Sequence, residues 1–170
     1  MRRRNVAGIT LIELLVVVVL IGILTAAAIP SYSAYVLRGQ RSAAKTALMQ
    51  AAQFLERNYT VLGCYPVTAG DCPAGAAATP PVVGLPTGLT VAPSDGGTVT
   101  YAIGLAPAGV GVAGQSFLLT ATPCAAAGGA CPTTGSNSTF TDPDCGFLTL
   151  DNTGAKTAQI ASATATCWRQ

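Results

Sequence analysis

The first third of the chain contains a long apolar run that is interrupted by a single charge. Ile9 to Ile29 is 21 residues long, and Glu13 is its only charged residue. A helix of this length can cross the hydrocarbon core of a bilayer. A carboxylate within such a helix is costly, about 2.5–3.5 kcal/mol for a central Asp on insertion scales, and acidic residues there usually have a partner. The run therefore predicts a membrane helix over residues 9–30, and Glu13 predicts an interaction with another group.

Distinct signals flank this run on both sides. Arg2, Arg3 and Arg4 precede it, and basic residues beside a membrane helix favour a cytoplasmic N-terminus. Pro30 follows it, and a proline within a helix removes one backbone hydrogen bond and crowds the preceding turn. We therefore expect a kink or local unwinding at Pro30.

The next segment, residues 31–62, keeps the helical period but is no longer apolar on all sides. Its apolar residues recur at intervals of three and four, and most of its charged and amide side chains are expected elsewhere around the helix. The apolar set is Ala44, Leu48, Ala51, Leu55 and Tyr59, and the polar set is Arg41, Lys45, Gln53 and Arg57. This pattern predicts an amphipathic helix with one packed face. Joined to residues 9–30, it gives one helix of about 50 residues, roughly 75–80 Å long.

The remaining part, residues 63–170, changes abruptly in composition. Sixteen of the 19 glycines, ten of the 11 prolines and all six cysteines lie beyond Leu62. Short β-like runs between turn signals cover residues 98–105, 116–122, 146–150 and 156–160. Asp151 to Gly154 reads as a hairpin turn, with Gly154 at positive φ. The sequence predicts an α+β fold: a long N-terminal α-helix packed on a small antiparallel β-sheet of three to five strands.

The six cysteines indicate disulfides in an oxidising compartment, because their number is even and they follow a membrane-targeting segment. They are Cys64, Cys72, Cys124, Cys131, Cys145 and Cys167. Six cysteines allow 15 pairings. Short spacings favour two local bridges, Cys64–Cys72 and Cys124–Cys131, which leaves Cys145–Cys167 to hold the C-terminal segment. Zinc is disfavoured because the chain has no C-x-x-C pair and no histidine.

Composition also argues against several other functions. After Asn58 the chain has only two basic residues, Lys156 and Arg169, against five aspartates, so a nucleic-acid-binding surface is not expected. Without histidine, no Ser/His/Asp or Cys/His arrangement is possible, and no phosphate-binding loop is present. We therefore predict no enzyme activity, no catalytic residue and no cofactor. The segment from Asp142 to Asp144, with Asp151, could form a calcium loop, but turn residues are the favoured interpretation and no metal site is predicted.

The segment from Gly8 to Glu13, Gly-Ile-Thr-Leu-Ile-Glu, resembles the class III signal of type IV pilins and pseudopilins. It follows a short basic leader and opens a long apolar helix. The resemblance extends over Pro30, the amphipathic continuation and the cysteine-clamped sheet. Within residues 63–170, which we call the head, the run Cys145-Gly-Phe-Leu-Thr-Leu-Asp-Asn-Thr-Gly and the pair Cys167-Trp168 are similar to PilE-type pilins, a group that includes minor pilins and DNA-uptake pilins.

This resemblance implies a processing and assembly route. Prepilin peptidase would remove residues 1–8 by cutting after Gly8 and would N-methylate Ile9, where most members have Phe. Glu13 would then pair with the Ile9 amine of a neighbouring subunit, and the helix between Gly22 and Pro30 would loosen in the filament. The implied partners are other pilin subunits, the peptidase, the pilus assembly machinery and the bacterial inner membrane. The implied function is that of a structural subunit of an extracellular filament used in adhesion, twitching motility or DNA uptake.

Other interpretations remain open. Within the family, the chain could be a major pilin, a DNA-uptake minor pilin or a pseudopilin of a secretion system. Outside it, Arg2–Arg4, Leu14–Leu24 and Ala26–Ala28 could form the three regions of an ordinary secretory signal, which would release a disulfide-rich soluble head beginning near Ile29. An uncleaved membrane anchor is a further alternative.

Overall fold

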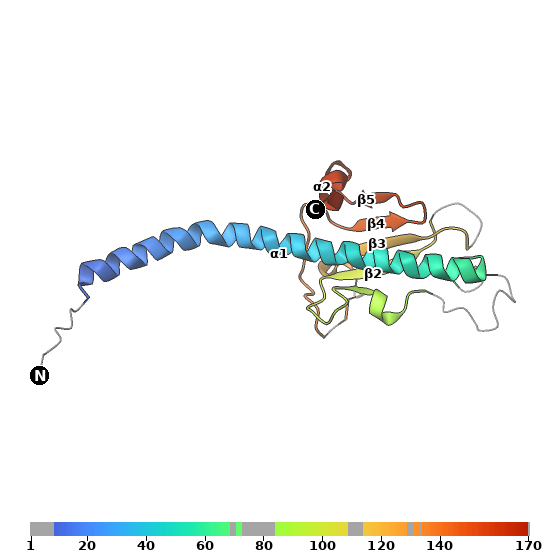
Figure 1. Ribbon diagram of the computed structural model, residues 1–170, viewed down its shortest axis with the longest axis horizontal. Coiled ribbons are helices and arrows are strands. Elements are labelled where there is room, and N and C mark those ends of the chain that lie inside the picture. Colours follow the sequence, from blue (N-terminus) through green and yellow to red (C-terminus); the bar gives the residue numbers. More distant parts are fainter. Residues whose placement is uncertain are drawn as a thin grey trace, which may run out of the picture. The chain divides into compact units, whose positions relative to one another are not determined.

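The computed structural model describes residues 9–68, 71–72, 84–108, 114–128, 131–132 and 134–169, and the side chains of residues 27–31 lie outside this description. The leader, residues 1–8, therefore lies outside it too, Gly8 included. The chain divides into two compact units, residues 1–37 and residues 38–170. Helix α1 (Leu11–Leu62) contributes to both (Figure 1).

Helix α1 begins and ends with recognisable caps. At its start the Glu13 amide donates to Thr10 Oγ1 over 3.3 Å, and the Leu14 amide donates to the Thr10 carbonyl over 3.2 Å. Thr10 is thus an N-cap, which satisfies an amide that has no partner within the helix. At its end Gly63 has φ 71° and its amide donates to the Tyr59 carbonyl over 2.8 Å. A left-handed residue is needed for this closure, so glycine is favoured there.

The helix is unbroken at Pro30, within a span of 52 residues. We expected a kink or local unwinding there; the single chain shows no unwinding, and the kink stays a prediction. The physical reason is that one proline removes a single donor. The hydrogen bonds of the neighbouring turns suffice to continue the helix.

In the unit of residues 38–170, five strands form an antiparallel sheet in the order β1-β2-β3-β4-β5. The strands are β1 (Val91–Ala92), β2 (Tyr101–Ala106), β3 (Leu118–Pro123), β4 (Leu148–Asp151) and β5 (Lys156–Ala158). The remaining elements are the short helices η1 (Thr87–Leu89), η2 (Cys124–Ala126), η3 (Ala161–Ala163) and α2 (Thr164–Arg169). The predicted α+β architecture is confirmed. We expected three to five strands, and the described sheet has five.

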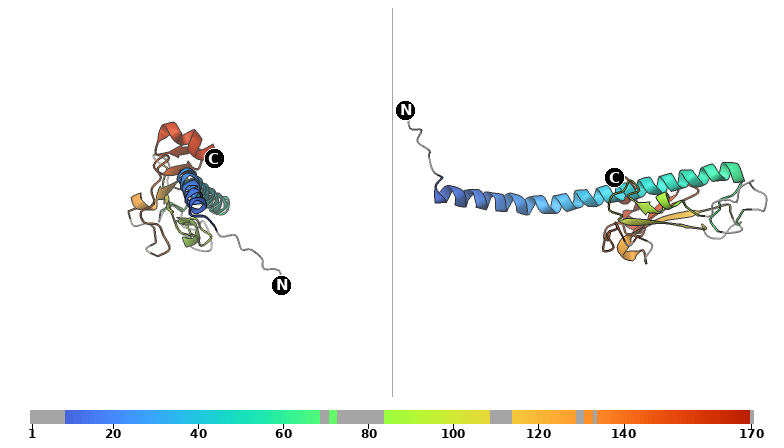
Figure 2. Two further views of the ribbon diagram at one scale, coloured as in Figure 1. Left: turned by 90° about the vertical axis from the view of Figure 1, so that its left-hand side faces the viewer. Right: turned by 90° about the horizontal axis from the view of Figure 1, so that it is seen from below.

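The core of this unit lies between the C-terminal half of α1 and one face of the sheet (Figure 2). Ala44, Leu48, Ala51 and Leu55 are buried as the helical period predicted. They meet side chains that alternate along the strands, including Tyr101, Ile103, Leu119, Ala121, Leu148 and Leu150. Alternate residues of a strand point to opposite faces. The core therefore receives every second residue of β2, β3 and β4.

The turn between β4 and β5 has the geometry that its sequence predicted. Gly154 takes φ 80°, and its amide donates to the Asp151 carbonyl over 3.0 Å. Asp151 Oδ1 accepts from the amides of Thr153 and Ala155, each over 2.9 Å. The side-chain hydrogen bond from Thr153 is the largest influence on the Asp151 carboxyl and lowers its pKa. Asp151 thus serves the turn.

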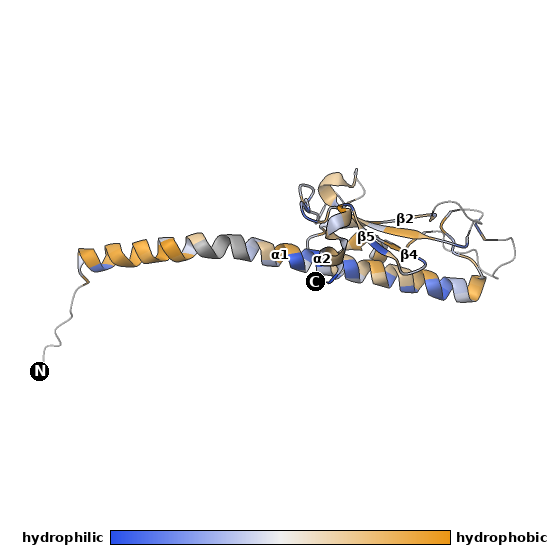
Figure 3. Ribbon diagram, turned by 90° about the horizontal axis from the view of Figure 1, so that it is seen from above, coloured by the Kyte–Doolittle hydropathy of each residue, from blue (hydrophilic) through white to orange (hydrophobic). Residues whose placement is uncertain are grey.

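Apart from Glu13, the first turns of α1 are mostly apolar as far as Leu24 (Figure 3). Their large side chains are exposed in the single chain, for example Leu11 at 83% and Leu24 at 70%. Within the residues that the structure describes, no helix meets the combined length and hydropathy requirement for a membrane span.

Candidate assembly site

The residues predicted to direct assembly lie at the start of α1. Ile9 is 77% exposed and Glu13 is also exposed. Glu13 is the acidic residue of the first helical turn, where a negative charge interacts favourably with the helix dipole. Thr10, three residues before it, is the cap. The sequence Thr-x-x-Glu therefore starts the helix and places the carboxylate at its first turn.

Glu13 also lines a shallow hollow of about 260 Å³ on this end of the helix, and the other lining residues are Ile9, Leu14, Val17 and Val18. The hollow is apolar except for the carboxylate. Such a surface can take an apolar side chain of a partner together with a cationic group beside Glu13. The structure thus brings Ile9 and Glu13 together, while Gly8 and the side chain of Pro30 lie outside the described residues.

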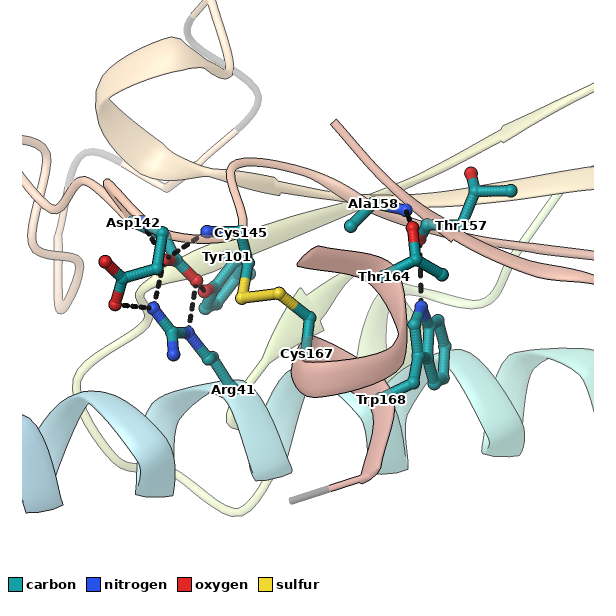
Figure 4. The surroundings of a disulfide bond; sticks show 10 residues. Arg41, Tyr101, Asp142, Cys145, Thr157, Ala158, Thr164, Cys167 and Trp168 are labelled. Carbon is teal, nitrogen blue, oxygen red and sulfur yellow. Dashed lines mark hydrogen bonds and ion pairs between the residues drawn. A yellow bond between two sulfur atoms is a disulfide. The ribbon is translucent and has the colours of Figure 1, made fainter. Parts of the chain in front are cut away.

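A second polar cluster joins α1 to the head, and sequence reasoning missed it. Arg41 is 4% exposed and Asp142 5% exposed, although 101 residues separate them in the chain. Arg41 donates from Nε to Asp142 Oδ2 over 2.7 Å and from Nη2 to Asp142 Oδ1 over 2.6 Å (Figure 4). Arg41 Nη2 also contacts Asp144 Oδ2 at 2.7 Å. This forked geometry makes a strong, directional ion pair.

The remaining bonds to Asp142 come from the head. The Tyr101 hydroxyl donates to Oδ2 over 2.7 Å, and the Cys145 amide donates to Oδ1 over 3.0 Å. The carboxylate therefore has partners on α1, on β2 and in its own loop. We call Arg41, Tyr101 and Asp142 the helix–head cluster.

Burial and pairing act in opposite directions on the pKa of Asp142. Burial by itself raises that pKa, but the hydrogen bonds from Arg41 and then Tyr101 outweigh it, so the pKa falls below its ordinary value. The pKa of the Arg41 guanidinium rises, chiefly because of its hydrogen bond to Asp142. Burial, followed by the bond to Asp142, raises the pKa of the Tyr101 phenol. Arg41 and Asp142 are consequently both charged at neutral pH.

The position of Arg41 corrects the helical pattern inferred from sequence. Arg41 and Lys45 were expected mostly away from the packed face, yet both are buried, at 4% and 8% exposed. Burial, and then repulsion from Arg41, lower the pKa of Lys45. Arg41 lies three residues before Ala44 and seven before Leu48, so it continues the apolar stripe. In the sequence, this helical register and the acidic Asp142-Pro143-Asp144 segment were the two features that could have indicated a buried ion pair.

The three aspartates considered for a calcium loop each bind protein groups in the structure. Both oxygens of Asp142 are bound by protein groups, and Asp151 serves the hairpin turn. Across the described ranges, no three His, Cys, Asp or Glu side chains are grouped so as to hold a metal ion.

Disulfides join Cys64 to Cys72, Cys124 to Cys131 and Cys145 to Cys167. These are the pairs that the sequence spacing favoured. The first follows the end of α1, and the second ties η2 to the loop after it. The third joins the loop of the helix–head cluster to α2.

Two parts of the chain match known protein families. Residues 3–29 match the prokaryotic N-terminal methylation motif. Residues 30–149 match the family described as type IV minor pilin ComP, DNA uptake sequence receptor. Because the second match covers well over half of its length, the chain belongs to this family of type IV minor pilins. Pilins are structural proteins.

One similar curated protein matches part of this chain. The fimbrial protein EcpC of Eikenella corrodens is 42% identical over 72 residues, which cover 42% of this chain and 46% of that protein. The chain thus spans less than half the length of this curated relative.

Two solved pilin structures are also similar. The type IV pilin from Shewanella oneidensis matches with a TM-score of 0.42 at 23% identity, over 79% of this chain and 99% of that chain. The non-core minor pilin PilV from Neisseria meningitidis matches with a TM-score of 0.40 at 21% identity, over 74% of this chain and 88% of that chain.

Proposed function

We propose that this chain is a subunit of a type IV pilus that enters the filament through its N-terminal helix. The observation that carries the proposal is the pair of adjoining family matches, an N-terminal methylation motif over residues 3–29 and a minor-pilin match from residue 30. The capped helix start, with Glu13 beside an exposed apolar hollow, supports it. In this proposal the precursor is inserted in the bacterial inner membrane through residues 9–30.

Processing would prepare the docking group. Cleavage after Gly8 by prepilin peptidase creates a new amine at Ile9, which the same enzyme methylates. Glu13 then pairs with the Ile9 amine of a neighbouring subunit, and the two apolar helices pack together. A buried ion pair adds little net stability over apolar packing, so its role is to set the register between subunits. In the assembled filament, the helix between Gly22 and Pro30 loosens.

The test is filament incorporation by Glu13→Ala, with Glu13→Gln as the isosteric form that lacks the charge. Both variants should stay in the membrane fraction and lose incorporation into sheared filaments at least several-fold. Thr46→Ala, an exposed position on α1, is the matched control and should incorporate normally. Normal incorporation of both Glu13 variants would contradict the docking role.

Mass spectrometry of the mature N-terminus tests the processing step separately. A methylated Ile9 is the expected result. An N-terminus at Ile29 would instead identify an ordinary secretory signal, and an intact leader would identify an uncleaved anchor.

A second candidate function is the reception of DNA at the head, and the family description favours it. The sequence argued against this activity because few basic residues follow Asn58. The structure describes four exposed basic residues in the unit of residues 38–170, namely Arg38, Arg57, Lys156 and Arg169. Binding by these residues would be electrostatic and would weaken steeply with salt.

A mobility-shift assay with the full chain in detergent micelles tests this candidate. Arg57→Gln and Lys156→Gln should each weaken binding if the head receives DNA. Sequence-selective binding would make the chain a receptor as well as a subunit. Weak, non-selective binding would contradict a receptor role and would support the structural role only.

A further inference from the structure

The sequence Asn-x-Ser/Thr, at which a sugar can be joined to an asparagine side chain, occurs twice in this chain. The two copies are Asn58-Tyr59-Thr60 and Asn137-Ser138-Thr139. They lie in different structures, the first within α1 and the second in a turn of the head. The chain therefore presents one short acceptor sequence in two backbone geometries.

The turn at residues 137–139 is exposed but firmly attached to the head. The Asn137 amide donates to the Val99 carbonyl over 2.8 Å, and the Asn137 carbonyl accepts from the Phe140 amide over 3.0 Å. The Phe140 ring packs edge-on against Tyr101, with 5.1 Å between the ring centres. An enzyme can therefore reach the Asn137 side chain while the head remains folded.

Within the turn, two groups of Thr139 bind the side chain of Asn137. The Thr139 hydroxyl donates to Asn137 Oδ1 over 2.9 Å, and the Thr139 amide donates to the same oxygen over 3.3 Å. This is the local side-chain bonding that asparagine favours in turns. Both bonds end on the carboxamide oxygen, so the turn does not use Nδ2, which is the atom that a sugar would join.

These bonds act on the chemistry of Nδ2. The nitrogen of a neutral amide is a weak nucleophile, because its lone pair is delocalised toward the carbonyl. Loss of a proton from Nδ2 creates a negative charge that is shared with Oδ1. Hydrogen bonds to the charged form of a group favour that form. The two donors of Thr139 therefore make it easier for the base of a transferase to remove a proton from Asn137 Nδ2.

The first copy of the sequence cannot form this arrangement. Asn58 is half-buried within α1, and residues two apart on a helix do not face each other. The Thr60 hydroxyl donates instead to the Arg57 carbonyl over 2.7 Å. While the helix is intact, Asn58 thus lacks the hydroxyl donor that Asn137 has.

We propose that Asn137 is an N-glycosylation site whose donor is a glycosyl pyrophosphate. The transferase base takes a proton from Nδ2, and the nitrogen attacks C1 of the sugar. The new bond is C1–Nδ2, the bond between C1 and the phosphate oxygen breaks, and its electron pair leaves with the pyrophosphate and its carrier. Asn58 carries the same acceptor sequence but is not modified in the folded chain. The inference does not depend on the proposed function.

The site is tested on the full chain purified from cells that naturally produce it. Peptide mass mapping, with fragmentation that leaves a sugar on its side chain, should show the mass of a glycan on Asn137. Occupancy should be several-fold higher at Asn137 than at Asn58. An unmodified Asn137 would overturn the site, and equal occupancy of the two asparagines would overturn its selection by the turn. This comparison uses the wild type alone, so it stands whether or not any variant folds.

Variants produced in the same cells test the part played by Thr139. Thr139→Ala keeps Asn137 but removes the hydroxyl donor, and it should lose the modification several-fold, whereas Thr139→Ser keeps a hydroxyl and should retain it. Asn58→Gln is the matched control and should leave the glycan on Asn137 unchanged. Mass analysis without reduction, which shows whether the three disulfides have formed, checks that each variant is folded. Full modification of a folded Thr139→Ala variant would overturn the role of the hydroxyl.

The carrier of the donor is identified in two further incubations. Full chain made in cells that do not modify it would be mixed in detergent micelles either with washed membranes of the native cells or with their soluble extract and UDP-N-acetylglucosamine. Modification of Asn137 by the washed membranes would assign a lipid-linked donor, and modification by the supplemented extract would assign a nucleotide-linked one. Modification in neither incubation would overturn the glycosyl pyrophosphate as the donor class.

Discussion

Arg41 shows how one residue can belong to two patterns. Its spacing from Ala44 and Leu48 places it on the apolar stripe, and its charge suggests the solvent face. In the structure Arg41 is buried and donates to Asp142, which also accepts a hydrogen bond from the Tyr101 hydroxyl. Burying a charge is costly unless it is paired and hydrogen-bonded, and here both conditions are met.

Removing Arg41 should therefore destabilise the head strongly. Arg41→Ala leaves Asp142 buried without its main partner, and breaking a buried pair in this way typically costs about 3–5 kcal/mol. Arg57→Ala changes an exposed arginine of the same helix that only contacts the Phe54 ring, and should cost no more than about 1 kcal/mol. Urea denaturation of the full chain in micelles, followed by Trp168 fluorescence, measures both. Equal effects of the two changes would contradict the role given to the cluster.

The pH dependence of stability should follow Asp142. Because its folded pKa is lowered, the carboxylate stabilises the fold above its unfolded pKa of about 3.9. That contribution is lost as the pH falls through the folded pKa. The unfolding free energy of the wild type should thus decrease on acidification below about pH 5, and more steeply than that of Asp142→Asn. Parallel pH profiles for the two proteins would show that another group dominates.

At the scale of elements, the sequence predicted the parts that depend on periodicity or on turn chemistry. The long helix follows from its apolar run and stripe, and the hairpin from Asp151 and Gly154. The strands β2 to β5 were placed within a few residues of their observed bounds. The two-residue strand β1 shows no alternation to detect, and the six residues of α2 include two threonines, which are weak helix formers. Both short elements are fixed by tertiary contacts.

The Arg41–Asp142 pairing could not be predicted for a different reason. Periodicity describes one element at a time, whereas this contact joins residues far apart in the chain. The Cys145–Cys167 pairing could be favoured only because the other four cysteines had been assigned to the two closely spaced pairs. Glu13 and Ile9 could be assigned to one end of one helix, because they are four residues apart.

The three disulfides should differ in their contribution to stability. Their sequence separations are 8, 7 and 22 residues. In the chain-entropy description the longest loop gains most, so replacing Cys145 and Cys167 by serine should cost about 1 kcal/mol more than replacing Cys64 and Cys72. Denaturation of the two double variants under identical conditions measures the difference. The reverse order would mean that native contacts at the first bridge outweigh loop entropy.

At the scale of the whole molecule, two units of different character share one helix. Residues 38–170 contain a packed core between helix and sheet, whereas the helix of residues 11–24 exposes its apolar side chains. Exposed apolar surface of this extent marks an interaction site. A subunit that completes its packing with other subunits has this distribution, and membership of the minor-pilin family accords with it.

The distance in sequence between Arg41 and Asp142 also sets the order of events during synthesis. The helix segment that carries Arg41 leaves the ribosome early, while Tyr101, Leu148 and Cys167 follow much later. Contacts between residues far apart in sequence form only after the intervening chain is present. The head therefore completes its fold only when nearly all of its chain is available. A chain arrested before Asp142 would hold Arg41 without its carboxylate partner and would lack the core residues of β4.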